Sequence, residues 1–218
     1  MLVGERMSQP VITIHPDVPV QEALALMAKE GIRRLPVVDQ RGRLIGIVTN
    51  LDLLHASPSD ATSLSIWEIN YLISKITVDE IMCKDVITVE KDLPVEEAAR
   101  IMADNKIGGL PVLENHTVIG IITETDLFKI FLELLGAREA GIRITALMPD
   151  MPGELAKLTM IIRNLGGNII ALTQALGESS ENRLVTVKVS GVDIKDLQKA
   201  VEPEVEKLID IRETKLSN

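Results

Sequence analysis

The sequence predicts an α+β protein in which a duplicated module precedes a smaller module with a different order of strands and helices. Two observations lead to this prediction. The segment that begins at Met7 recurs, almost without gaps, in the segment that begins at Met82, and such internal repetition indicates two copies of one folding unit. From Gly141 onward the pattern of apolar and polar residues changes. A chain of 218 residues is long enough for more than one domain.

The composition narrows the class of protein. Hydrophobic residues make up 46% of the chain, and no apolar run approaches the roughly 20 residues that cross a bilayer. The start of the chain lacks the order of a signal peptide, so we expect a cytoplasmic protein. A net charge of −9 and an aromatic content of 2% argue against binding to nucleic acids or anionic membranes. The apolar neighbours of Cys83, the single cysteine, predict a buried thiol.

The duplication is supported by matches spread along the whole module. Strand-like runs, the start of a helix and an aspartate all recur in the same order and at nearly the same spacing. The matching segments are residues 11–13 and 86–88, 17–23 and 92–98, 35–38 and 110–113, and, after a one-residue deletion, 45–49 and 119–123, with Asp52 matched by Asp126.

Each copy predicts the order strand, helix, strand, strand, helix. Apolar residues at helical spacing indicate one buried helix face, and Pro19 and Pro94 suit the first turn of the two helices. Two β-rich runs around a polar turn then predict adjacent strands. In the first copy the helix face comprises Val20, Ala23, Leu24, Met27 and Ala28, the strands are residues 35–38 and 44–48, and the last helix begins at Asn50 or Leu51.

This element order, with a Thr-x-x-Asp motif after the last strand, resembles the CBS domain, and the tandem copies resemble the CBS pair, or Bateman module. The resemblance spans about residues 7–132. A helix-compatible insert with the only Trp and Tyr is similar to that of CBS proteins of the acetoin-utilisation type. We therefore expect a first CBS domain at residues 1–56, a linker with a helix at 57–80 and a second CBS domain at 81–135.

The Thr-x-x-Asp motifs predict a nucleoside-binding site. Thr49 and Asp52, and likewise Thr123 and Asp126, lie three residues apart where a strand leads into a helix. A carboxylate there can accept both ribose hydroxyls, and the hydroxyl with the helix N–H groups favours a phosphate. The resemblance implies these same roles for Asp and Thr. The alternative is that the threonines are helix caps and the aspartates first-turn charges.

The remaining predicted ligand contacts differ between the copies. Arg33 and Arg34 precede the first Leu-Pro pair and suit phosphates, whereas Gly108 and Gly109 precede the second. This predicts two unequal clefts, unless the arginines are merely surface charges. The expected ligand is AMP, ADP or ATP, or else S-adenosylmethionine or NAD. The predicted nucleotide-binding residues are Val11, Ile12, Arg33, Arg34, Pro36, Thr49, Asp52, Val86, Ile87, Gly109, Pro111, Thr123 and Asp126.

The tail predicts a ferredoxin-like module, because its elements follow the order strand, helix, strand, strand, helix, strand. It resembles an ACT domain over residues 140–214, with a Pro-Gly pair in the first strand-to-helix loop. The resemblance implies an amino acid at Asp150, Pro152 and Gly153, although these residues also suit a plain turn and many ACT domains serve mainly for assembly. The elements are strands at residues 142–148, 168–176, 184–189 and 205–211 and helices at 155–165 and 193–201.

These features predict a regulatory sensor rather than an enzyme. His15, His55 and His116 lack metal-ligand spacing, and neither a nucleophile elbow nor a P-loop appears. The sensor is expected to form a homodimer and to control a protein or pathway that the residues do not identify. The alternative is a structural or interaction protein whose nucleotide clefts are vestigial.

Overall fold

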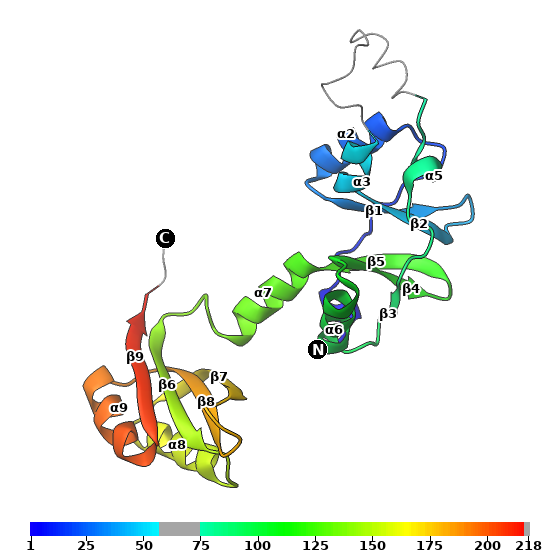
Figure 1. Cartoon of the computed structure of the whole chain (residues 1–218). Coiled ribbons are helices and arrows are strands. Elements are labelled where there is room, and N and C mark those ends of the chain that lie inside the picture. The colour runs from blue at the N-terminus through cyan, green and yellow to red at the C-terminus, as the bar shows by residue number, and fades with distance from the viewer. Residues whose placement is uncertain (57–74, 216–218) are drawn as a thin grey trace. The chain divides into compact units, whose positions relative to one another are not determined.

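The computed structural model describes residues 1–56 and 75–215, which divide into two compact units, Met1–Leu127 and Phe128–Asn218 (Figure 1). The helix expected in the insert falls on residues 57–74 and so lies outside the described residues. The first unit holds both copies of the duplicated module, and the second holds the tail. Of the helices that the structure describes, none combines the length and the apolar character needed to cross a membrane.

The first copy forms a helix, a β-hairpin and a second helix. These elements are α2 (Val20–Glu30), β1 (Arg34–Val38), β2 (Leu44–Thr49) and α3 (Asn50–His55). The predicted first strand is reduced to a single bridge between Ile14 and Val37. Pro19 lies at the N-cap of α2, one residue before its first turn. Gly31 ends the helix with φ 65°, a left-handed conformation that glycine adopts without strain.

The second copy repeats this arrangement with a fuller sheet. Its elements are β3 (Val89–Glu90), α6 (Val95–Asn105), β4 (Gly109–Glu114), β5 (Thr117–Thr123) and α7 (Glu124–Leu134). The strand β3 pairs in parallel with β4, which pairs antiparallel with β5. The predicted element order is complete in the second copy, and the first copy lacks only the leading strand. Apolar spacing in α2 and α6 and β-rich runs in the hairpins set the same local structures in both.

The two copies exchange their leading segments. Residues of α1 (Val3–Arg6) pack on the second copy, where the Val3 amide donates to the carbonyl of Leu93 at 2.9 Å. Residues of α5 (Val78–Ile81) pack on the first copy, where the Val78 amide donates to the carbonyl of Val18 at 3.0 Å. Each core is therefore completed by the segment that precedes the other copy, and the copies form one folded unit.

Glycines on the hairpins make this exchange sterically feasible. A side chain at Gly46 would collide with Met82, and one at Gly120 would collide with Met7. These methionines are equivalent residues of the exchanged segments. The recurring Ile-Gly-Ile motif therefore accepts a methionine from the partner copy at each hairpin.

The second unit is a four-stranded antiparallel sheet with the strand order β7-β8-β6-β9. Its core joins alternate sheet residues, such as Ile144 and Val187, to Leu158 and Leu197 of the two helices. Arg143 alternates with these core residues along its strand and therefore lies on the other face of the sheet. The elements are β6 (Gly141–Pro149), α8 (Glu154–Asn164), β7 (Asn168–Leu176), β8 (Asn182–Ser190), α9 (Ile194–Val201), η1 (Glu202–Glu204) and β9 (Lys207–Thr214). This is the predicted ferredoxin-like order.

Candidate functional site

A cavity of about 480 Å³ in the first unit combines residues from both copies. The volume lies in the range of small-molecule sites. One wall comes from the end of β2 and the start of α3, and another from the segments before β3 and β4. The lining residues are Arg33, Arg34, Ile47, Thr49, Asn50, Leu51, Asp52, Cys83, Asp85, Val86, Ile87, Lys106, Ile107, Gly108 and Gly109.

The Thr49–Asp52 pair forms a reciprocal capping box at the start of α3. The Thr49 amide and hydroxyl donate to Oδ2 of Asp52 at 2.8 and 2.7 Å, and the Asp52 amide donates to Thr49 Oγ1 at 3.3 Å. The cap predicted as the alternative is therefore present. The cap does not exclude the ligand role, because Asp52 Oδ1 takes no part in the box and the residue lines the cavity. The box fixes the orientation of the carboxylate.

The same motif in the second copy differs in exposure. The Thr123 amide and hydroxyl donate to Oδ2 of Asp126 at 3.0 and 2.8 Å. Asp126 is only 6% exposed, however, whereas Asp52 is half-buried. The first-copy aspartate is thus the more accessible of the two to a ligand.

The structure corrects the predicted division of arginines and glycines between two clefts. Arg33 and Arg34 line the same cavity as Gly108 and Gly109. The two pairs occupy equivalent positions of the two copies, and folding brings these positions together. The cavity therefore has cationic side chains on one side and, on the other, glycine backbone that a ligand can approach closely.

Arg34 also makes an ion pair with the second copy. Its Nη2 lies 3.7 Å from Oε2 of Glu124, the first residue of α7. A side chain at Gly108 would collide with both partners, so this glycine makes room for the pair. Burial lowers the pKa of Arg34, an effect that Glu124 opposes. Glu124 is the equivalent of Asn50, which lines the cavity in the first copy.

The remaining predicted contacts separate into two groups. Val86 and Ile87 line the cavity, as expected for an apolar wall. Val11 and Ile12 are outside its described lining, and Pro36 and Pro111 are buried in β1 and β4. A buried strand residue supports the wall without touching the space within it.

Two lining residues differ from the sequence analysis or were missed by it. Cys83 is exposed and lines the cavity, contrary to the predicted buried thiol, because its segment crosses to the first copy. Lys106 adds a further cation. It ends α6 at φ 54°, where the first copy has Gly31. A lysine in place of the expected helix-ending glycine was the available signal.

The loop of the tail at which an amino acid was predicted is exposed, and its aspartate is already paired with an arginine of the same chain. Asp150 pairs with Arg183 at 2.8 Å, an interaction that raises the pKa of this arginine. Pro152 is exposed, and Gly153 caps α8 with φ 96°. Glu154, 7% exposed, lies in the first turn of α8 and accepts a hydrogen bond from Lys157 Nζ at 2.6 Å.

Comparisons with known proteins agree with this architecture. The chain matches the CBS domain family over residues 3–59 and 78–133 and the TTHA0829-like ACT domain over residues 140–212. The L-aspartate semialdehyde sulfurtransferase of Methanocaldococcus jannaschii is 34% identical over 60% of this chain, which spans only 23% of that protein. The CBS domain-containing protein DDB_G0289609 of Dictyostelium discoideum is 35% identical over 62% of this chain and 94% of that protein.

Solved structures resemble the first unit. The CBS domain pair of protein MJ0100, in complex with 5′-methylthioadenosine and S-adenosyl-L-methionine, is 33% identical with a TM-score of 0.51 and covers 64% of this chain and 98% of its own. The candidate acetoin utilization protein AcuB from Vibrio cholerae is 32% identical with a TM-score of 0.53 over 62% and 93%. CBSX2 in complex with AMP is 29% identical with a TM-score of 0.50 over 60% and 96%.

CBS and ACT domains are regulatory modules. By the matches to the two family models, the chain belongs to the CBS-domain family, as a tandem CBS pair followed by an ACT domain.

Proposed function

We propose that this protein is a regulatory sensor that binds an adenine nucleotide or another adenosine-containing molecule in the cavity of its CBS pair. The main observation in support of this proposal is that one cavity of about 480 Å³ brings together the Asp52 carboxylate, an aliphatic wall and the cations Arg33 and Arg34. These groups match the ribose, the base and the phosphates in turn. Relatives solved with AMP and with S-adenosylmethionine support the ligand class.

Within the cavity, Asp52 is the proposed ribose ligand. Its Oδ2 is held by Thr49, so Oδ1 is presented in a fixed direction. Val86 and Ile87 supply the apolar contact for the adenine, and Ile87 is 39% exposed, which leaves its side chain accessible to a ligand. AMP, ADP and ATP are the first candidates because the arginines favour phosphate; S-adenosylmethionine and NAD remain in the ligand set.

The second cleft, at Thr123 and Asp126 with Val11 and Ile12, is proposed to bind more weakly. Asp126 is 6% exposed. Glu124 also stands where the first copy has the neutral Asn50, and a carboxylate there repels phosphates. An adenosine ligand without phosphates suits this cleft better than ATP.

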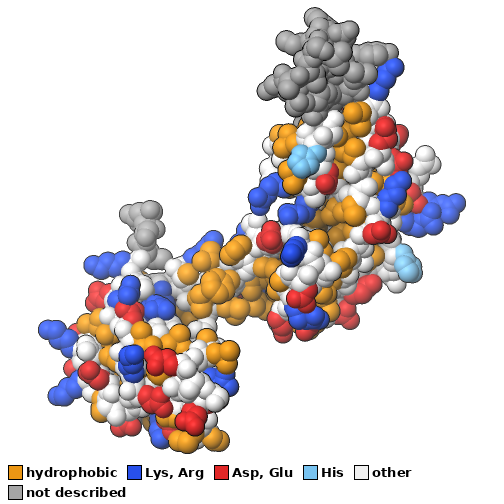
Figure 2. Space-filling model, viewed as in Figure 1, with side chains coloured by type: hydrophobic (Ala, Val, Ile, Leu, Met, Phe, Trp, Pro, Cys, Tyr) orange, Lys and Arg blue, Asp and Glu red, His pale blue; other side chains and the backbone are white. Residues whose placement is uncertain are grey.

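The signal is proposed to reach a partner protein through the ACT domain or through a homodimer. Both phenylalanines of the chain, Phe128 and Phe131, are 68% and 55% exposed on α7, where hydrophobic side chains gather in Figure 2. Exposed apolar side chains of this kind favour association between copies. An amino acid at Asp150, Pro152 and Gly153 stays a prediction.

Ligand-induced stabilisation tests the proposal. The melting temperature of the full chain is measured with AMP, ADP, ATP, NAD and S-adenosylmethionine. A ligand of the native state at about 100 times its Kd adds about 2.7 kcal/mol of stability, so at least one of the five should raise the melting temperature. If none does, the vestigial-cleft alternative is favoured.

Matched variants then locate the site. Asp52→Asn keeps an oxygen for the Thr49 cap but loses the charge, and should weaken the best ligand about tenfold or more. Asp126→Asn is the control and should leave that affinity within about twofold, since it alters a buried aspartate outside the described cavity. Equal losses in the two variants would contradict the assignment to the first copy.

A further inference from the structure

The ACT domain carries a polar face on its sheet, on the side away from the core. In β6, Ile142 and Ile144 belong to the core, so Arg143 and Thr145 lie on the opposite face. In β8 the same alternation places Thr186 and Lys188 on that face. Lys188 is only 4% exposed, which is unusual for a lysine.

The strand register aligns these side chains in two rows. Arg143 is directly opposite Lys188, and Thr145 is directly opposite Thr186. The two threonine hydroxyls lie 3.0 Å apart and share a hydrogen bond. Like charges that face each other across neighbouring strands are destabilising. The arrangement of Arg143 beside Lys188 therefore favours a negative charge nearby.

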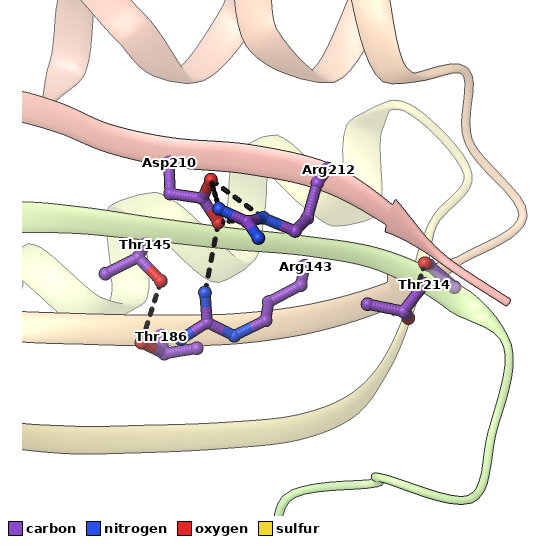
Figure 3. A network of polar contacts seen from close by, with 7 residues as sticks. Arg143, Thr145, Thr186, Asp210, Arg212 and Thr214 are labelled. Atoms are coloured by element: carbon purple, nitrogen blue, oxygen red, sulfur yellow. Dashed lines mark hydrogen bonds and ion pairs between the residues drawn. The ribbon is translucent and has the colours of Figure 1, made fainter.

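The two cations differ in how the chain neutralises them. Arg143 Nη1 donates to Asp210 Oδ2 at 3.1 Å, and Asp210 is shared with Arg212, as Figure 3 shows. These interactions, with the Arg212 hydrogen bond the largest, lower the pKa of Asp210. Lys188 Nζ donates to the carbonyl of Gly136 at 2.8 Å. Within residues 1–56 and 75–215 it makes no ion pair, although a buried ammonium is costly without one.

A cavity of about 330 Å³ adjoins this lysine. It is large enough for a small metabolite. Its walls combine cations and hydroxyls on the sheet with apolar side chains of the segment that leads into β6. The lining residues are Leu135, Ala137, Arg143, Ala171, Thr173, Thr186, Lys188 and Thr214.

We propose that this cavity binds a small organic carboxylate, whose charge is met by Lys188 and Arg143 and whose polar atoms are met by Thr173 and Thr186. Lys188 has two ammonium hydrogens beyond the one that it donates to Gly136. Leu135, Ala137 and Ala171 suit a short aliphatic chain. The site is distinct from the loop of Asp150 and Gly153, and it does not depend on nucleotide binding in the CBS pair.

Amide NMR on the full chain tests the site directly. Lactate, pyruvate and succinate are titrated into the protein, with inorganic phosphate and sulfate as anion controls. At least one carboxylate should shift the amides of Thr173, Thr186 and Lys188 in a saturable way. Lys188→Met should weaken this binding about tenfold or more, because a charge-assisted hydrogen bond is lost.

Lys199→Met is the matched control, since Lys199 is exposed on α9. It should leave the affinity unchanged. Thr173→Val keeps both cations and should weaken binding by a smaller factor, which provides a second variant if Lys188→Met does not fold. The proposal is overturned if no carboxylate shifts these amides, if phosphate binds as well as the carboxylates, or if the affinity survives in both variants.

Discussion

The two CBS copies share one scaffold but differ in the side chains around their Thr-x-x-Asp motifs. In both, the threonine hydroxyl donates to the aspartate three residues later, at 2.7 and 2.8 Å. Arg33, Arg34 and Asn50 line the cavity that contains the first motif, whereas Glu124 stands in place of Asn50 beside the second motif. The duplicated parts are those that hold the fold. Charge and exposure differ between the two motifs, so we expect the repeat to give two unequal sites.

The largest expected effect tests the shared scaffold. Gly46→Val and Gly120→Val should each lower the free energy of unfolding by about 1–3 kcal/mol, because the new side chain meets a methionine of the exchanged segment. Gly46→Val should be the more costly, since the carbonyl oxygen of Cys83 also lies 3.1 Å from the added Cβ position. Urea unfolding measures both. A neutral effect at either glycine would contradict the exchange at that hairpin.

A smaller effect tests the difference between the copies. Glu124→Asn gives the second copy the residue of the first and releases Arg34 from its ion pair. The affinity for AMP should rise about two- to fivefold, the range expected for a partly exposed charge. Calorimetry with AMP measures the change, and adenosine, which has no phosphate, is the control. An equal gain for adenosine would show that charge is not the cause.

The smallest effect concerns the two hairpin turns. In the first copy Asp39 Oδ1 accepts the amides of Arg41 and Arg43, and hydrogen bonds from Arg43 hold the pKa of this carboxyl below its usual range. Because the pKa of Asp39 is lower in the folded chain than in the unfolded chain, the carboxylate stabilises the turn at pH values above its unfolded pKa. This stabilisation is lost as the pH falls through the folded pKa.

The second turn provides the comparison. It uses Asn115 and His116 at φ 50° and 66°, as in type I′ hairpins, and has no such carboxylate among the described residues. In an NMR titration the amides of Arg41 and Arg43 should therefore shift with a midpoint below the ordinary aspartate pKa. A midpoint at or above that value would contradict the hydrogen bonding.

The element order could be predicted because local patterns determine it. Apolar spacing from Val20 and the β-rich runs of the hairpins gave α2, β1 and β2 at nearly their observed bounds. The segment exchange could not be predicted in this way. Met7 and Met82 are equivalent in sequence, so an alignment cannot tell which copy each one contacts.

The same reason explains what was missed in the site. The Thr-x-x-Asp motif was local and therefore visible, including its capping alternative. The joint cavity of Arg33 and Gly108 depends on how the copies pack, and so does the exposure of Cys83. The ion pair of Arg34 with Glu124 joins residues far apart in the chain, which local patterns do not report.

The most direct test of the central claim is a titration of the wild-type chain with AMP, followed by the amide signals of Thr49 and Thr123. Each amide donates to the aspartate of its own motif, so each reports ligand contact at one copy. We expect the Thr49 amide to shift at a lower AMP concentration than the Thr123 amide. A shift at Thr123 first, or equal midpoints at both threonines, would contradict it.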